Sequence, residues 1–186
     1  MIKILPNFLS KEDFKTTQNY IFNELSWTYN NYIAGSEKDS LDDFQFVHNF
    51  FSIRNPYLDQ PISSHSHILK PILLKLTPFY LFRVKLNLRP RTVVPHESAV
   101  HTDFGDRKFH KFDQTTAIYY LNTNNGYTLF EDGTKIDSVE NTMVLFDGNL
   151  KHSGVSCTDQ KRRIVLNINY IPGFNQDGSE YIPDKC

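Results

Sequence analysis

Two histidines and an aspartate are the side chains of this sequence best suited to bind a metal ion. His101 and Asp103 lie two positions apart, and such residues project from the same face of a β-strand. An imidazole and a carboxylate could therefore converge on one cation. His152 is the best third ligand, because it lies between an expected strand at 142–147 and another that Arg163 opens. Three ligands on one triangular face would leave three coordination positions of the ion open.

Arg163 follows His152 after 11 residues and opens a strand in which polar and apolar residues alternate. Its side chain is expected on the polar face, where a planar guanidinium would bind the far carboxylate of a dicarboxylic acid through two hydrogen bonds. Two neutral imidazoles and one carboxylate leave residual positive charge on a divalent ion, which favours an anionic cosubstrate. Arg162 takes the place of Arg163 in this interpretation if the strand register slips by one residue.

In these residues the sequence resembles the 2-oxoglutarate and Fe(II)-dependent oxygenases, particularly the prolyl-4-hydroxylase-like branch. The resemblance covers roughly residues 79 to 170, and its short segments are specific only together. The segments are His101-Thr102-Asp103, Thr116-Ala117-Ile118-Tyr119-Tyr120-Leu121-Asn122, Val144-Leu145-Phe146 before His152, and Arg163-Ile164-Val165-Leu166-Asn167.

The resemblance implies a role for each matched residue. His101, Asp103 and His152 correspond to the iron ligands and are the expected catalytic residues. Arg163 corresponds to the residue that binds the C5 carboxylate of 2-oxoglutarate. Tyr120 corresponds to a tyrosine whose hydroxyl group hydrogen-bonds the same carboxylate.

Strand alternation agrees with the choice of Tyr120, because it sends this residue and its neighbour Tyr119 to opposite faces of the sheet. Asn87 is a further candidate for cosubstrate binding, from the polar face of an earlier strand. The sequence departs from the better-known hydroxylases between Leu88 and Ser98. It departs again at 126–130, where the family often has a glycine pair.

The elements that must position these residues begin near Phe79, where apolar residues start to recur with a period of two. This pattern predicts short strands separated by turns, as in a sandwich or jelly roll. In the strands at 82–89 and 163–170 we expect the apolar faces to lie under N-terminal helices and the polar faces to line a cavity. An exposed antiparallel sheet would alternate in the same way. Further strands are expected at 98–103, 115–122, 127–130 and 142–147, with hairpin turns at Asn124-Asn125-Gly126 and Asp132-Gly133.

The N-terminal part of the chain has helical periodicity. A capped segment predicts a helix at about 11–25. A second helix is expected to begin at Ser63 or Ser64, and Pro71 would either mark its first turn or kink it. The residues between the helices, at 44–51, have strand character.

Composition and charge fit one globular domain. The 186 residues include 15 Phe and 10 Tyr, enough large apolar surface for a core. The 20 Lys and Arg nearly cancel the 21 Asp and Glu, so no global field would bind a polyanion. Two cysteines, Cys157 and Cys186, are too few for a disulfide framework or a cysteine-based zinc site. Without a signal-peptide pattern or a long apolar run, the expectation is a soluble, cytoplasmic protein with no membrane partner.

Other residues that could bind a metal or a partner have no assigned role. His65 and His67 would point to different faces of a helix, which makes joint chelation poor. The basic run at 107–111 could contact an acidic partner or single-stranded nucleic acid, cover a substrate as a lid, or be solvated. The histidines interpreted as surface or hydrogen-bonded residues are His48, His96 and His110.

The expected protein is a single domain over residues 1–186, mainly β, with a helical part at about 1–78. Its core at about 79–172 would be a double-stranded β-helix, the jelly roll of cupin-like proteins. The resemblance implies a dioxygenase that hydroxylates a C–H bond with Fe(II), 2-oxoglutarate and O2, releasing succinate and CO2, with ascorbate as a further candidate cofactor.

The favoured substrate is a peptidyl proline, and hence a peptide or protein partner rather than a small molecule or nucleic acid. Two alternatives come from other classes: a jelly-roll binding module without catalysis, and a cupin-like metalloenzyme that does not use 2-oxoglutarate. The sequence leaves the substrate and the oligomeric state open.

Overall fold

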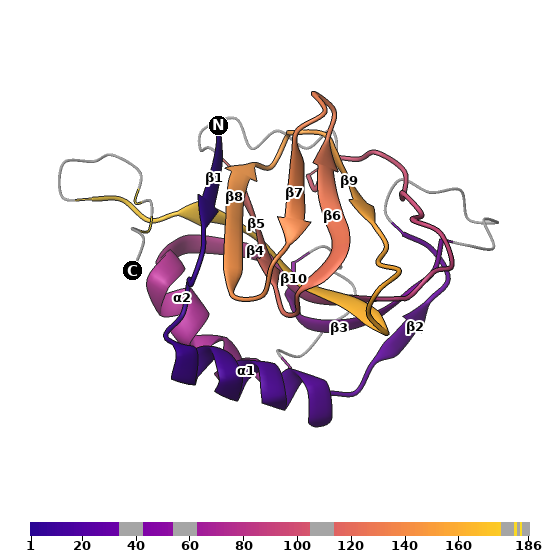
Figure 1. Ribbon diagram of the computed structural model, residues 1–186. Helices are drawn as coiled ribbons and strands as arrows, with labels where there is room; N and C mark the ends of the chain where they lie inside the picture. The colour runs from indigo at the N-terminus through magenta and orange to yellow at the C-terminus, as the bar shows by residue number, and fades with distance from the viewer. Residues whose placement is uncertain (34–42, 54–62, 105–113, 176–180, 182, 184–186) are drawn as a thin grey trace.

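A computed structural model of the chain describes residues 1–33, 43–53, 63–104, 114–175, 181 and 183. Within these residues ten strands form two antiparallel sheets (Figure 1). Seven strands make the large sheet, in the order β1-β8-β5-β10-β4-β3-β2, and three make the small sheet, in the order β7-β6-β9. The protein is therefore mainly β, with the antiparallel sheets of a sandwich or jelly roll.

The strands range from three residues in β2 to 13 in β4. The large sheet contains β1 (Ile2–Leu5), β8 (Thr142–Asp147), β5 (Thr115–Tyr120), β10 (Arg162–Pro172), β4 (Pro78–Pro90), β3 (Gln45–Ser52) and β2 (Thr28–Asn30). The small sheet contains β7 (Lys135–Ser138), β6 (Asn124–Phe130) and β9 (His152–Val155). The helical elements are α1 (Lys11–Asn23), the 3-10 helix η1 (Ser66–Leu69) and α2 (Lys70–Leu76).

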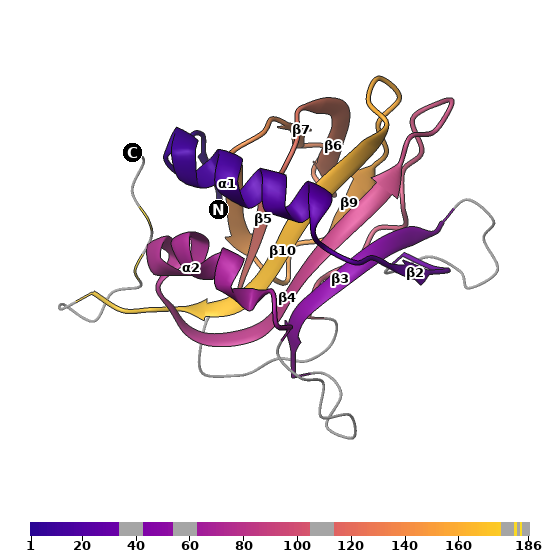
Figure 2. The same ribbon diagram turned by 90° about the horizontal axis from the view of Figure 1, so that it is seen from below.

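The helices lie on one face of the large sheet, and the small sheet lies on the other (Figures 1 and 2). Helix α1 begins after Ser10, whose hydroxyl accepts a hydrogen bond from the backbone amide of Asp13 at 3.1 Å. The second helical segment begins at η1, later than the expected Ser63 or Ser64. Pro71 lies in the first turn of α2, where its missing N–H costs no hydrogen bond. No helix among the described residues has the length and apolar character needed to cross a membrane.

Strands β4 and β10 have one apolar face and one polar face, as their alternation predicted. The apolar residues pack under the helices in the main core: Val84, Leu86, Ile164, Leu166 and Ile168. The polar set faces the space between the two sheets: Arg83, Lys85, Asn87, Arg89, Arg163 and Asn167. The alternative of a fully exposed polar face is wrong, because this face lines a partly open cavity between the two sheets.

A second apolar cluster joins the two sheets beside that cavity. From the large sheet it takes Ile118, Tyr120, Val144, Phe146 and Val165, and from the small sheet Phe130 and Ile136. Burial of these side chains fixes the distance between the sheets. The sheets therefore pack on the β5–β8 side and enclose polar groups on the β4 side.

Two local expectations are wrong. Residues 98–103 form no strand; the segment from Glu97 to His101 pairs with β9 only through two isolated bridges. Asn124, Asn125 and Gly126 lie inside β6, where the pairing with β7 shifts register, rather than in a hairpin turn. The turn at Gly133 is present, with a left-handed φ of 85° that favours glycine.

The region before residue 79 contributes strands as well as helices. β1 pairs with β8, and β2 and β3 extend the large sheet beyond β4. The boundary expected at residue 79 is therefore not a boundary of the sheet. The strand expected at 44–51 is β3, whereas β1 and β2 are too short to show a period of two.

Candidate active site

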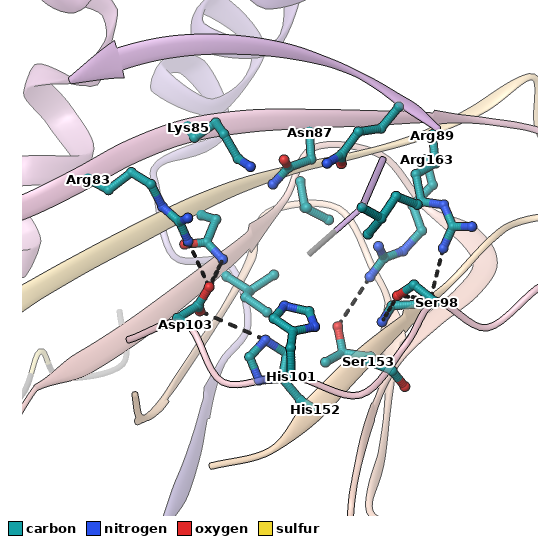
Figure 3. Close-up of a pocket in the computed structure, with 17 residues that line it drawn as sticks. Arg83, Lys85, Asn87, Arg89, Ser98, His101, Asp103, His152, Ser153 and Arg163 are labelled. Atoms are coloured by element: carbon teal, nitrogen blue, oxygen red, sulfur yellow. Dashed lines mark hydrogen bonds and ion pairs between the residues drawn. The ribbon is translucent and has the colours of Figure 1, made fainter. Parts of the chain in front are cut away.

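His101, Asp103 and His152 meet at the wall of the cavity between the sheets (Figure 3). One ligand atom from each residue lies within 4.8 Å of the others, and the three form the only such group of His, Cys, Asp and Glu among the described residues. The Nε2 of His152 is 3.8 Å from the Oδ2 of Asp103. Two imidazoles and one carboxylate at this spacing can bind one divalent transition-metal ion.

The backbone brings the two histidines together through an isolated antiparallel bridge. The amide of His101 donates to the carbonyl of His152 at 3.0 Å, and the amide of His152 donates back at 2.9 Å. The ring centroids lie 4.8 Å apart. The expected strand geometry of His101 and Asp103 is wrong, because Asp103 lies in a bend after the bridge. The three side chains nevertheless converge as predicted.

The histidines present the nitrogens that a metal would need. The Nδ1 of His101 is 3.1 Å from the carbonyl oxygen of Ala99, and the Nδ1 of His152 is 3.0 Å from that of Leu150. A carbonyl only accepts, so each Nδ1 carries a proton, and in the neutral ring the lone pair then lies on Nε2. Burial, and then the neighbouring His152, lowers the pKa of His101, which favours its neutral form.

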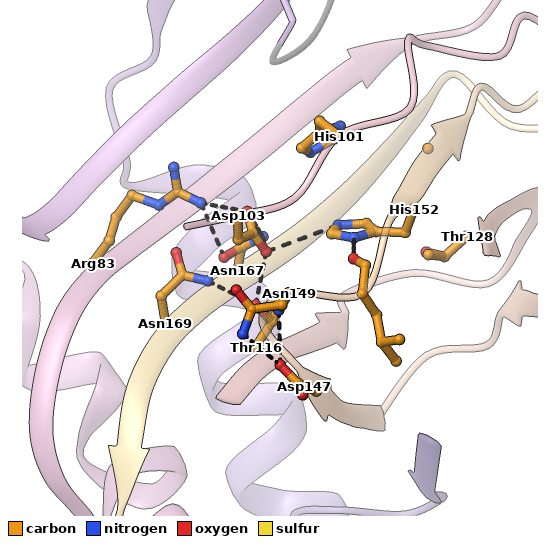
Figure 4. Close-up of polar contacts among 12 residues, drawn as sticks. Arg83, His101, Asp103, Thr116, Thr128, Asp147, Asn149, His152, Asn167 and Asn169 are labelled. Carbon is orange, nitrogen blue, oxygen red and sulfur yellow. Dashed lines mark hydrogen bonds and ion pairs between the residues drawn. The ribbon is translucent and has the colours of Figure 1, made fainter. Parts of the chain in front are cut away.

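Asp103 is buried and held by three side chains (Figure 4). Arg83 donates to Oδ1 at 2.7 Å, Thr116 donates to Oδ2 at 2.9 Å, and the Asn167 amide lies 3.2 Å from Oδ2. Burial by itself raises the pKa of this carboxyl group, but Arg83 and the two histidines bring it below the usual range. The carboxylate is therefore ionised and oriented before any ligand binds.

Arg163 reaches the same cavity from β10 and is 5% exposed. Its Nε donates to the hydroxyl of Ser138 at 2.9 Å, and one terminal nitrogen donates to Thr128 at 3.2 Å. Burial lowers the pKa of the guanidinium. No acidic side chain among the described residues pairs with Arg163, and a buried cation in this state is a strong indication of an anionic ligand.

The register between Arg162 and Arg163 is as expected. The guanidinium of Arg162 lies 4.6 Å from the ring centre of Phe22, a residue of α1, and so on the helix side of the sheet. Tyr119 lies on that side too, where its hydroxyl donates to Asn141 at 2.6 Å. Only Arg163 of the two arginines lines the cavity.

Tyr120 lies next to the cavity, but does not line it. Its side chain is buried in the apolar cluster between the sheets, and its hydroxyl donates to Thr128 at 2.9 Å. The guanidinium of Arg163 is 5.6 Å from the ring centre. The structure therefore places Tyr120 beside Arg163 and Thr128.

Asn87 lines the cavity, and its Oδ1 is buried without a hydrogen-bond partner among the described residues. Such an orphaned acceptor is costly unless a ligand or water satisfies it.

Gly126 makes room for the side chain of Arg163: a Cβ there would lie 2.8 Å from the Cδ of Arg163 and 2.7 Å from the carbonyl oxygen of Val155. The sequence departure at 126–130 thus contains a glycine that the cavity wall requires.

Several residues of the site were not assigned from the sequence. Arg83 and Asn167 were on the predicted polar faces, but nothing in the sequence showed that they meet Asp103. Ser138 and Thr128 come from the small sheet, and only the packing of the two sheets brings them to Arg163.

The unassigned histidines have structural partners. His48 contacts the carbonyl of Ser26 at 2.9 Å, and His96 contacts Asp43 at 3.0 Å. The Nδ1 of His65 lies 2.8 Å from the hydroxyl of Tyr20. The basic run at 107–111, including His110, lies outside the described residues.

No protein-family profile and no curated protein sequence matches this chain. Solved structures match its fold. A viral collagen prolyl hydroxylase from Paramecium bursaria Chlorella virus-1, in a 2-oxoglutarate complex, matches with a TM-score of 0.52 and 16% identity, over 91% of this chain and 96% of that chain.

Two further solved structures also match the fold. The α-ketoglutarate-dependent carbocyclase SnoK from nogalamycin biosynthesis matches with a TM-score of 0.60 and 14% identity, over 98% of this chain and 89% of that chain. HygX from Streptomyces hygroscopicus, with nickel, 2-oxoglutarate and hygromycin B bound, matches with a TM-score of 0.53 and 11% identity, over 99% and 92%.

Proposed function

Because this chain has the fold of the 2-oxoglutarate and Fe(II)-dependent oxygenases, prolyl-4-hydroxylases among them, we propose that it is a dioxygenase of this kind. It hydroxylates a C–H bond of its substrate, and it converts 2-oxoglutarate and O2 to succinate and CO2. Fold alone does not determine activity, so the proposal rests on the site.

One observation carries the proposal: three side chains that can bind a metal ion, and a buried arginine with no acidic partner among the described residues, line the same cavity. A metal site alone would fit a cupin-like enzyme that does not use 2-oxoglutarate. A dicarboxylic cosubstrate requires a cation away from the metal as well, and Arg163 supplies it. The combination supports an oxygenase over the binding module and the cupin-like alternative.

The donor set fits Fe(II), since it offers two Nε2 lone pairs and an ionised carboxylate. His101, Asp103 and His152 would hold the ion. Bound iron would supply the redox and oxygen chemistry that protein side chains lack. Ascorbate is proposed only as an accessory reductant.

The chain's own groups bind and orient the cosubstrate. Arg163 binds its C5 carboxylate through charge-assisted hydrogen bonds. The hydroxyls of Ser138 and Thr128 hold the guanidinium in place, and Tyr120 supports Thr128. The side-chain amide of Asn87 is a further proposed contact, because Asn87 lines the cavity and its NH2 group can donate to a carboxylate oxygen.

Succinate formation from 2-oxoglutarate tests the activity without a known substrate. The purified protein with Fe(II), O2 and ascorbate is expected to convert 2-oxoglutarate to succinate slowly, and His152→Ala is expected to be inactive. Binding of 2-oxoglutarate without any succinate under these conditions would support the binding module instead.

A peptidyl proline is the substrate that we propose first, by similarity to the prolyl hydroxylases. A small molecule is the second candidate. The structure of SnoK, from nogalamycin biosynthesis, and that of HygX, with hygromycin B bound, match over at least 98% of this chain.

One experiment distinguishes the two substrate candidates. A proline-rich peptide should gain one oxygen atom by mass spectrometry and should accelerate succinate formation, whereas free proline should do neither. A peptide without effect would contradict the first candidate.

A further inference from the structure

We infer that Arg83 is a positioning residue, which holds the carboxylate of Asp103 so that one oxygen faces the two histidines. The inference rests on the proposed function in one respect, because it treats Asp103 as a metal ligand. It adds a residue of β4 that takes no part in the motif around His101.

The contacts divide the two oxygens of Asp103 between different tasks (Figure 4). Oδ1 accepts from Arg83 at 2.7 Å, on the β4 side of the carboxylate. Oδ2 lies 3.8 Å from the Nε2 of His152, within the metal-binding group. Rotation of the carboxylate away from this orientation would lengthen the contact with Arg83. The arginine therefore helps to hold the carboxylate in the orientation that turns one oxygen toward the histidines.

The contacts of Arg83 are directed mainly at Asp103. Its side chain is 13% exposed and that of Asp103 is 3% exposed. Within the described part of the chain, Asp103 is the only carboxylate that Arg83 pairs with, and the Nε of Arg83 is buried without a hydrogen-bond partner. Asn167 completes the arrangement, because it contacts both Arg83 and Asp103.

Positioning and simple electrostatics predict opposite effects on metal binding. A guanidinium near the site repels a divalent cation, so removal of its charge alone would tighten metal binding. Loss of the hold on a ligand weakens metal binding instead, typically about 10- to 100-fold for partners of a coordinating group. The sign of the change therefore distinguishes the two roles.

The test is a calorimetric titration with Mn(II), in the absence of 2-oxoglutarate, of the full chain and two variants. Arg83→Gln is expected to raise the Kd for Mn(II) about 10-fold or more. Lys85→Gln is the matched control, because it removes the same charge from the same cavity-lining face of β4. This control is expected to leave the Kd unchanged or lower it. An unchanged or lower Kd in Arg83→Gln would overturn the inference.

A spectrum separates positioning from a general loss of structure. In the protein saturated with Co(II), the visible absorption bands report coordination geometry. They are expected to change in Arg83→Gln and not in Lys85→Gln. Identical spectra in wild type and Arg83→Gln would also overturn the inference.

The Mn(II) titration has two further outcomes. If Arg83→Gln does not fold, as judged by circular dichroism, Arg83→Met replaces it, because methionine keeps an unbranched side chain and cannot donate a hydrogen bond to Asp103; a Kd equal to that of the wild type then overturns the inference. If the wild type itself does not bind Mn(II), the proposed function and the inference fail together. If the wild type binds Mn(II) and Arg83→Gln binds it equally or more tightly, only the role of Arg83 is removed.

Discussion

In the proposed function, Arg163 is the residue that binds the far carboxylate of the cosubstrate. Truncation of one partner of a buried charged pair costs about 2–5 kcal/mol, so Arg163→Gln should raise the Kd for 2-oxoglutarate roughly 30-fold or more. Arg162→Gln is the matched control, because its guanidinium lies over Phe22 on the helix side of the sheet. Calorimetry with the Mn(II)-loaded protein would measure both. The reverse ranking would mean that the two faces of β10 are exchanged.

The three candidate metal ligands are expected to contribute to chemistry more than to stability. His101→Ala, His152→Ala and Asp103→Ala should each abolish succinate formation and leave the circular dichroism spectrum nearly unchanged. A variant that keeps the wild-type rate would show that its residue is not a ligand.

The adjacent tyrosines should separate binding from stability. Tyr120→Phe removes a hydroxyl that donates to Thr128, a partner of Arg163, and should weaken 2-oxoglutarate binding by about 0.5–1.5 kcal/mol. Tyr119→Phe removes a hydroxyl that donates to Asn141 under the helices. It should lower the unfolding free energy by about 1 kcal/mol and leave the Kd for 2-oxoglutarate unchanged. If Tyr119→Phe were the variant that weakens binding, the proposed role of Tyr120 would be wrong.

At the scale of elements, regular alternation was the most informative part of the sequence. In β4 and β10 it identified the cavity-facing residues and the choice of Arg163 over Arg162. Irregular segments were not predictable in this way. The residues around His101 are held by two bridges to β9 rather than by a ladder, and β9 itself has only four residues. Their pairing is non-local, so no local pattern reveals it.

The Asn-Gly sequence at 125–126 was misinterpreted for a related reason. Asn-Gly is a strong hairpin signal when only local conformation matters. Here Gly126 serves a tertiary contact, since it lets the Arg163 side chain and the Val155 carbonyl approach β6. The glycine at this position is therefore explained by contacts with other strands and not by a turn.

Gly126→Ala should therefore disturb the packing of β6 and the position of the Arg163 side chain. The added methyl group would lie 2.7 Å from a backbone oxygen of β9, which cannot move as a flexible side chain can. We expect a loss of stability of about 1–3 kcal/mol and weaker 2-oxoglutarate binding. Gly133→Ala would be a control for β-turn strain alone, since no atom lies within 4 Å of its added Cβ. Thermal unfolding and 2-oxoglutarate titration would show whether only Gly126→Ala affects binding.

At the scale of the whole molecule, the fold follows from how its two sheets are covered. Helices bury one face of the large sheet, and the small sheet buries part of the other. The sequence resemblance predicted this oxygenase fold, and solved structures confirm it at 11–16% identity. The contacts that orient Asp103 could not be predicted, because they join residues of β4 and β10 that are distant from it in the sequence.

The open site between the sheets should make the stability of the whole protein depend on its ligands. A ligand present at about 100 times its Kd stabilises the native state by about 2.7 kcal/mol. For a domain of this size that corresponds to a Tm increase of about 5–10 °C. Mn(II) together with 2-oxoglutarate should produce such a shift in wild type. His152→Ala should show almost none, and an equal shift in that variant would place the metal elsewhere.

The most direct test of the central claim, that the triad and Arg163 form one site for metal and 2-oxoglutarate, is an anaerobic titration. Fe(II) and 2-oxoglutarate would be added to the protein, and the visible absorption of an Fe(II)–2-oxoglutarate chelate would be recorded. We predict a saturable band that requires both additions, is lost in His152→Ala, and needs much more 2-oxoglutarate in Arg163→Gln. No band in the wild type, or the same titration curve in all three proteins, would contradict the claim.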